Sequence, residues 1–203
     1  QEPRFLKRLR ELTAEHGTVL IFDEVINGFR FGFHGYAKVV GVQPDLTTLG
    51  KIIGGGLPVG AVVGGAAILD RLAPLGKTYQ AGTMAGNPVA LAAGIATLTE
   101  LRTGAPYRHL AALGAVMDSA VDSKKDRAFR MVRVGSLFWP YYALTGPIPT
   151  QAEKIAPDAV AGFKSRYGKW LDAGFYLPPS AYEVGFLSAA HSPNDVERLV
   201  AAL

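Results

Sequence analysis

Two residues of opposite charge, Asp23 and Lys51, each follow a short apolar stretch of the sequence. Residues 19–22 form a continuous run of strand-forming side chains that ends at Asp23, as expected for a buried parallel strand. A carboxylate there lies at the carboxyl edge of a sheet, where open α/β sheets bind ligands. Residues 46–49 lead to Lys51, which three glycines follow closely. An ammonium partly desolvated in this way becomes a usable nucleophile or base.

One cofactor needs both of these groups. Pyridoxal phosphate requires a lysine for its Schiff base and an acid that keeps the ring nitrogen protonated, so that the ring acts as an electron sink. Asp23 and Lys51 would fill those roles. Each residue also has an ordinary explanation, because a carboxylate after a strand often caps a helix or faces water, and a loop lysine is commonly a solvated surface charge. The order of residues leaves these alternatives open.

Longer motifs surround both residues and recur in one known family. Residues 18–98 and 176–192 resemble class III, fold-type I pyridoxal-phosphate aminotransferases, and within them the aminomutases that convert glutamate 1-semialdehyde to 5-aminolevulinate. The motifs that carry the resemblance are FDEVINGFRFGFHG, PDLTTLGKIIGGGLPVGA, YQAGTMAGNPVALAAG and YLPPSAYEVGFLSAAHS. A set of long motifs in a fixed order is far more specific than a single short one.

The resemblance implies a role for four residues. Lys51 would carry pyridoxal 5'-phosphate and, with the pyridoxamine form, act as general base and acid. Asp23 would hold the ring nitrogen, and Glu183 would point into the active site near the lysine. Thr83 matches a threonine that binds the cofactor phosphate of the neighbouring subunit. The resemblance therefore implies a homodimer with shared active sites and a small amino-aldehyde or amino-acid substrate.

Several other functions stay open. Many family transaminases place an arginine just before the Pro-Pro pair to hold a substrate carboxylate, but no arginine lies between Arg166 and Arg198. This favours the aminomutase, with a class III aminotransferase that uses an external amino acceptor as the alternative. The chain would otherwise be an inactive fragment that serves as an assembly module. A metal-dependent hydrolase that uses Asp23 and Glu24 is an alternative with less support, because adjacent strand residues point to opposite faces.

The sequence begins at Gln1, without a methionine or a signal-like segment. We therefore expect a piece of a longer protein, with a missing N-terminal half or a complementary chain as a partner. Family members carry in that upstream half an aromatic residue that stacks on the cofactor ring and a glycine-rich loop that holds its phosphate.

Composition excludes several classes of function. The chain of 203 residues contains no cysteine, which removes disulfides and thiolate chemistry and suits a cytoplasmic protein. The net charge of +4 is mild, and no basic run exceeds Lys124-Lys125, so nucleic-acid binding is not expected. The four histidines lack metal-ligand spacing. Glycine and proline interrupt the long uncharged stretches, so we expect buried core there and no membrane span.

The pattern of elements predicts an α/β fold in two parts. Residues 1–102 would complete a large cofactor-binding domain with a mostly parallel sheet covered by helices on both faces, and residues 103–203 would form a small C-terminal α/β domain. A first helix, residues 3–16, would bury Phe5, Leu9 and Leu12, and Asn87 would cap a helix over residues 89–101. Expected in the small domain are strands at 130–134, 137–142, 175–177 and 185–189 and a last helix beginning near Ser192.

Overall fold

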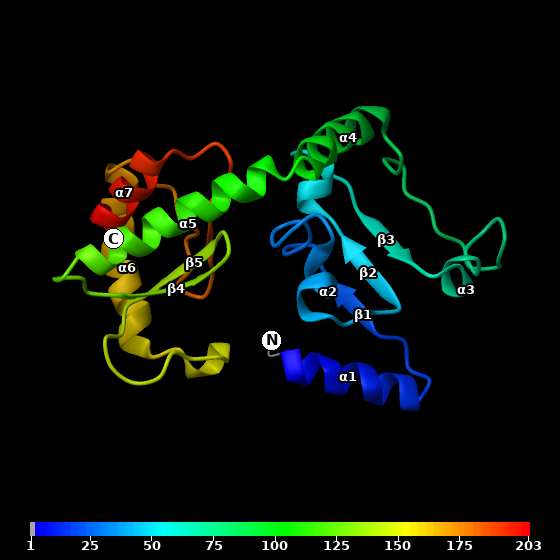
Figure 1. Cartoon of the computed structure of the whole chain (residues 1–203), viewed down its shortest axis with the longest axis horizontal. Coiled ribbons are helices and arrows are strands. Elements are labelled where there is room, and N and C mark those ends of the chain that lie inside the picture. Colours follow the sequence, from blue (N-terminus) through cyan, green and yellow to red (C-terminus); the bar gives the residue numbers. More distant parts are fainter. Residues whose placement is uncertain (1–2) are drawn as a thin grey trace. The chain divides into compact units, whose positions relative to one another are not determined.

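The chain divides into two compact units, residues 1–107 (unit 1) and 108–203 (unit 2). A computed structural model describes residues 3–203 (Figure 1). The long helix α5 (Ala105–Ser123) crosses the division. The boundary predicted at residues 102 and 103 falls just before this helix, in the short turn that follows α4.

Unit 1 is built around a three-stranded sheet in the order β1-β2-β3. Strands β1 and β2 are parallel, with Asp23 opposite Thr48, whereas β2 and β3 are antiparallel. Of the two strand pairings in this sheet, one is therefore parallel and the other antiparallel. The elements are α1 (Pro3–Glu15), β1 (Ile21–Asp23), α2 (Gly35–Val40), β2 (Leu46–Leu49), η1 (Lys51–Gly54), β3 (Ala61–Gly64), α3 (Ala66–Leu69) and α4 (Pro88–Arg102).

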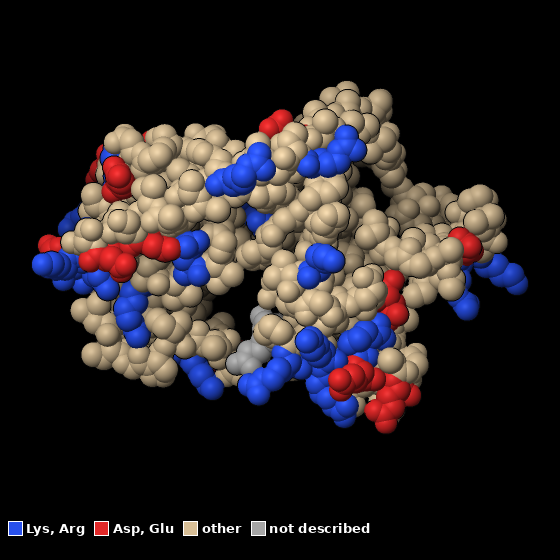
Figure 2. All heavy atoms as spheres, viewed as in Figure 1, with Lys and Arg blue, Asp and Glu red and all other residues tan. Residues whose placement is uncertain are grey.

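Helix α1 forms as the sequence predicts, but it buries a different face. Leu6 is buried and Leu9 packs beside it, whereas Phe5 and Leu12 are 55% and 36% exposed. The predicted face of Phe5, Leu9 and Leu12 is therefore wrong, because the α1 residue buried in the cluster with strand residue Phe22 is Leu6. On the outer surface of this helix acidic and basic side chains lie together, including the Arg8–Glu11 ion pair (Figure 2).

The start of helix α4 confirms a local prediction. The Asn87 side chain accepts hydrogen bonds from the amides of Val89 and Ala90 at 3.0 and 3.2 Å, and Pro88 occupies the first turn. These bonds satisfy amide groups that have no partner within the helix. Gly94 of α4 lies directly against the backbone of η1, where a side chain would collide with the Ile53 carbonyl oxygen. Helix α4 therefore supports the segment that begins at Lys51.

Unit 2 contains an antiparallel sheet and three long helices. The sheet has the order β4-β5-β6, and Figure 1 shows α6 and α7 with it. The core encloses Trp170 and Phe129, which are both 0% exposed. Besides α5, the elements are β4 (Arg130–Val134), β5 (Leu137–Tyr141), η2 (Ala152–Lys154), α6 (Pro157–Asp172), β6 (Gly185–Phe186) and α7 (Pro193–Ala202).

Two predictions for the end of the chain are corrected. Residues 175–177 form no strand. The Phe175 amide donates to the Trp170 carbonyl oxygen at 2.8 Å, and the Tyr167 hydroxyl donates to the Leu177 carbonyl oxygen at 3.1 Å. These bonds tie the segment to α6 rather than to a neighbouring strand. Strand β6 is also shorter than the predicted 185–189. The predicted cap of α7 is confirmed, because Ser192 forms a capping box with Asp195.

Residues 3–203 contain neither a candidate membrane span nor a candidate metal cluster. None of the helices there is both long and apolar enough to span a membrane. In the same residues, no group of three or more histidine, aspartate or glutamate side chains is arranged to hold a metal ion.

Candidate active site

Asp23 is the last residue of β1, and its carboxylate is fixed from two directions. Its Oδ1 accepts the Val25 amide and the Thr48 hydroxyl, both at 3.0 Å. These two hydrogen bonds, with a smaller contribution from the charge of Lys51, hold the pKa of Asp23 below its usual range. The side chain is also exposed. Asp23 is therefore an ionised and accessible acceptor at neutral pH.

Lys51 stands at the first position of η1, in an unusual backbone conformation. Its φ is +48°, in the left-handed region that residues other than glycine seldom adopt. Gly50 before it is extended, with φ −167°. Backbone strain of this kind concentrates at functional sites. The parallel pairing of β1 and β2 brings Lys51 near Asp23, since its charge contributes to the pKa of that carboxyl.

The burial predicted for Lys51 is not observed. The residue is exposed. Within this chain, the Lys51 ammonium is therefore less covered than the sequence predicted. The charge of Lys51 acts on Asp23, and the joint role of the two residues stays a prediction.

Glu24 is a site residue whose role the sequence reasoning missed. It is 2% exposed, and its carboxylate accepts the amides of Tyr36 and Ala37 at 2.8 and 3.1 Å. Gly35 has a φ of +72°, and a Cβ there would lie 2.8 Å from Glu24 Oε2. Glu24 thus anchors the start of α2, and Asp23 faces the other way. The sequence offered a signal, because side chains alternate along a strand and Glu24 therefore shares a face with Phe22 rather than with Asp23.

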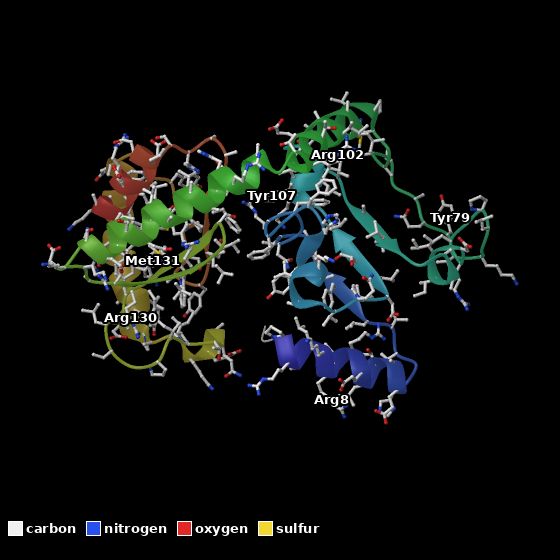
Figure 3. All side chains as sticks on the ribbon, viewed as in Figure 1. Arg8, Tyr79, Arg102, Tyr107, Arg130 and Met131 are labelled. Atoms are coloured by element: carbon white, nitrogen blue, oxygen red, sulfur yellow. The ribbon has the colours of Figure 1, made fainter. Side chains whose placement is uncertain are left out.

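Thr83 lies in an exposed turn just before the Asn87 cap of α4. The whole segment between α3 and α4 is accessible, with Tyr79 83% and Met84 62% exposed. Figure 3 shows Tyr79 on this segment. No hydrogen bond or ion pair joins Thr83 to Asp23 or Lys51 within the described residues. Its predicted role concerns a neighbouring subunit and stays a prediction.

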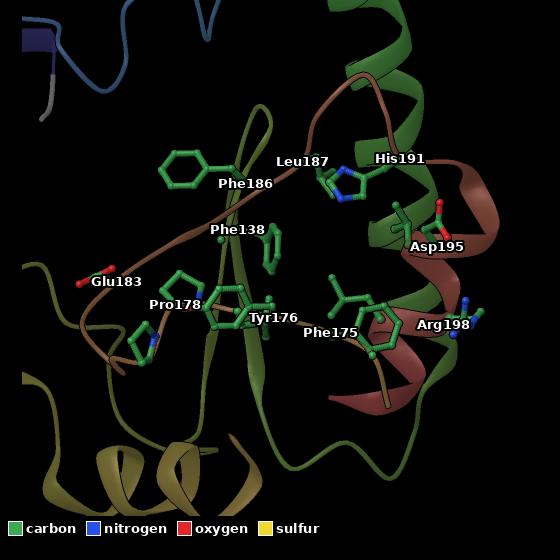
Figure 4. Close-up of a pocket in the computed structure, with 16 residues that line it drawn as sticks. Phe138, Phe175, Tyr176, Pro178, Glu183, Phe186, Leu187, His191, Asp195 and Arg198 are labelled. Carbon is green, nitrogen blue, oxygen red and sulfur yellow. The ribbon is translucent and has the colours of Figure 1, made fainter. Parts of the chain in front are cut away.

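Glu183 belongs to unit 2 and is exposed. Its amide donates to the Ser180 carbonyl oxygen at 3.2 Å, which closes a tight turn after the two prolines. The side chain lines a cavity of about 620 Å³ (Figure 4). Its predicted role beside the lysine likewise stays a prediction.

The donor set around Asp23 fits a pyridoxal cofactor. An ionised, accessible carboxylate is the partner that a protonated ring nitrogen requires. A lysine amine near it supplies the group that can attach to the carbonyl of the cofactor. Thr48, whose hydroxyl orients Asp23, is a further supporting residue that only the strand register reveals.

Comparison with known proteins identifies the family. Residues 1–139 match the family described as aminotransferase class III. The chain belongs to this family. Its class III relatives include a glutamate-1-semialdehyde 2,1-aminomutase of Syntrophomonas wolfei, 47% identical over 200 residues. That alignment covers 97% of this chain and 46% of the relative, so the chain spans about half the length of the curated relatives it matches.

Solved structures of class III enzymes share the fold. An omega-transaminase from Sphaerobacter thermophilus superposes with a TM-score of 0.83 at 34% identity, over 99% of this chain and 46% of the other. A glutamate-1-semialdehyde aminomutase from Pseudomonas aeruginosa gives 0.78 at 28% identity, over 98% and 46%. The predicted fold, the C-terminal part of a fold-type I transferase, is thereby confirmed.

Proposed function

We propose that this chain is part of a pyridoxal-phosphate-dependent aminomutase that converts glutamate 1-semialdehyde to 5-aminolevulinate, a tetrapyrrole precursor. The observation that carries the proposal is the fixed Asp23 carboxylate beside the strained Lys51. The curated relative from Syntrophomonas wolfei, named as such an aminomutase and 47% identical, supports the choice of reaction. The chain covers 46% of that relative, so the activity belongs to a longer protein.

The roles of Asp23 and Lys51 are argued from the chemistry of their side chains, and those of Thr83 and Glu183 from the family resemblance. When bound, pyridoxal or pyridoxamine phosphate supplies an electron sink and a carrier for the amino group. Asp23 stays ionised and holds the proton on the ring nitrogen. Lys51 Nζ takes and returns protons at the substrate carbons. Thr83 binds a phosphate of the neighbouring subunit, and Glu183 orients the second nitrogen of the substrate.

The proposal extends to partners and location. The rest of the aminotransferase fold, on the same polypeptide or a complementary one, packs against unit 1. Support comes from the large apolar side chains that unit 1 exposes, among them Ile21 at 52% and Ile95 at 67%. We further propose a homodimer with shared active sites, because Thr83 lies in the exposed segment before α4. The complete protein would work in the cytoplasm.

A class III aminotransferase with an external amino acceptor is the second candidate. The similarity to the omega-transaminase of Sphaerobacter thermophilus, 34% identical, favours it. The two reactions differ in one requirement. An aminomutase returns the amino group to the same substrate, whereas an aminotransferase needs a second carbonyl compound for every turnover.

The test uses the complete protein, assembled from this chain and the other half of the fold. Turnover of glutamate 1-semialdehyde without any added carbonyl compound would support the aminomutase, and strict dependence on an added acceptor would support the aminotransferase. Lys51→Ala should lower kcat by about 10²–10⁴-fold, since it removes the proton carrier. The matched control, Lys77→Ala, changes another exposed lysine and should leave kcat unchanged. Full turnover by Lys51→Ala would refute the assignment, and an inactive wild-type assembly would favour the assembly-module alternative.

A further inference from the structure

Unit 2 contains a cavity that the proposed chemistry does not explain. Its volume is about 620 Å³, within the range of small-molecule sites. The wall consists of residues from β5, the segment 174–179, the turn before β6 and helix α7. Buried apolar side chains form part of it, with Phe138 3%, Leu187 2% and Val196 1% exposed. The apolar wall would shield the body of a ligand from water.

One end of the cavity carries a positioned cation. The Arg198 guanidinium carbon lies 5.6 Å from the centre of the Phe175 ring, and both residues line the cavity. Stacking on an aromatic ring restricts the guanidinium plane. Within residues 3–203, this guanidinium makes no hydrogen bond and no ion pair. Its donors are therefore available to a ligand.

Asp195, a carboxylate of the same helix that also lines the cavity, already accepts other hydrogen bonds. Asp195 Oδ2 accepts the amide and the hydroxyl of Ser192 at 2.8 and 2.7 Å. These bonds hold the pKa of Asp195 below its usual range, with a smaller contribution from the charge of Arg198. The carboxylate thus caps α7, and it does not pair directly with Arg198.

A second donor lies at the same end. His191 Nδ1 accepts the Ser188 amide at 2.9 Å, so the neutral ring carries its proton on Nε2. The His109 ring donates to the His191 carbonyl oxygen at 2.9 Å, which anchors this loop. His191 lines the cavity together with Arg198. The end of the cavity near α7 therefore offers hydrogen-bond donors.

Charge and shape together define a ligand class. Figure 4 shows Arg198 and Glu183 at opposite ends, with Phe175, Tyr176 and Phe138 between them. We propose that this cavity is a binding site for a small carboxylate with an aromatic body. The carboxylate pairs with the fork of the Arg198 guanidinium, and the ring packs on the aromatic side chains.

This inference does not rest on the proposed aminomutase activity. Every lining residue belongs to unit 2, and none of Asp23, Lys51 and Thr83 is among them. Glu183 lines the other end, so a bound ligand would also lie near a residue proposed for the active site. Binding can be measured without cofactor, substrate or turnover.

The test titrates the chain with 3-phenylpropanoate and follows backbone amide shifts by NMR. The matched neutral compound, 3-phenylpropanamide, keeps the shape and removes the charge. We expect the carboxylate to bind with a dissociation constant on the order of 1 mM, with shifts concentrated at Phe175, Gly185 and Arg198. The amide should bind about threefold to tenfold more weakly, because the pair with the exposed guanidinium is lost.

Two variants complete the experiment. Arg198→Gln should weaken binding of the carboxylate by about threefold to tenfold and leave binding of the amide unchanged. Arg108→Gln, an exposed arginine outside the cavity, is the control and should bind like the wild type. Equal affinity for the two compounds, no effect of Arg198→Gln, shifts confined to unit 1, or no binding up to about 10 mM would each overturn the proposal.

Discussion

The two units differ in how completely each buries its own apolar side chains. Unit 2 encloses Trp170, Phe129 and Met117 at 0% exposure. Unit 1, which carries Asp23 and Lys51, leaves Ile21 and Val62 of its sheet 52% and 53% exposed. Unit 2 therefore closes its main core within this chain. The proposed chemistry instead resides on a scaffold with large apolar surfaces that suit further polypeptide.

The core of unit 2 gives the largest expected effect. Trp170→Ala should lower the free energy of unfolding by about 3–5 kcal/mol, because it empties a fully buried site that contacts several aromatic rings. Chemical denaturation followed by circular dichroism measures the loss. Tyr176→Ala, at a position 84% exposed, should change stability by less than about 0.5 kcal/mol. Equal losses in both variants would contradict a closed core in unit 2.

Adjacent carboxylates in unit 1 give the next effect. Glu24→Ala should cost about 2–3 kcal/mol, because it leaves the partly buried amides of Tyr36 and Ala37 without their acceptor. Asp23→Ala removes an exposed carboxylate and should affect stability much less. Denaturation of both variants measures the difference. A larger loss for Asp23→Ala would show that the two roles are assigned the wrong way round.

Helix α1 tests how unit 1 selects its buried face. Leu6→Ala should cost about 2 kcal/mol, since Leu6 is 8% exposed and packs in the cluster with Phe22. Phe5→Ala removes a larger side chain that is 55% exposed, and should cost less than about 0.5 kcal/mol. Thermal unfolding compares the two. The reverse order of stabilities would restore the face predicted from the sequence.

An ion pair on unit 2 gives the smallest effect. Arg133 Nε donates to Asp118 Oδ1 at 2.8 Å. Hydrogen bonding from Arg133 holds the pKa of Asp118 below its usual range. A depressed pKa in the folded state adds stability above the unfolded value of about 3.9, and this is lost as the pH falls through the folded pKa. Asp118→Asn should therefore cost about 0.5 kcal/mol at pH 7. A difference from the wild type that fails to narrow below about pH 4 would contradict this cause.

Local signals in the sequence predicted much of the fold. The caps at Asn87 and Ser192 were found because the bonds that form them join neighbouring residues. Strand β4 was predicted with its observed bounds. The assignment of Asp23 and Lys51 to one site came from the residues and the motif resemblance, and it stays a prediction.

The failures have a tertiary cause. Periodicity alone could not show that Leu6 of α1 enters the buried cluster and Phe5 does not. The strand-forming residues 175–177 are held by Tyr167 and Trp170 of α6, which no local pattern reveals. The exposure of Lys51 depends on which segments cover it. Burial of Glu24 could have been inferred locally, because the two-residue period of a strand places it on the face of Phe22.

The central claim is that Lys51 attaches pyridoxal phosphate beside Asp23. The direct measurement is reduction with borohydride after incubation with pyridoxal phosphate, followed by peptide mapping, on this chain alone and mixed with the N-terminal half of the fold. We expect a visible absorption band and a pyridoxyl group on Lys51, with neither in Lys51→Ala. No adduct in the mixed sample, or an adduct only on other lysines such as Lys77, would contradict the claim.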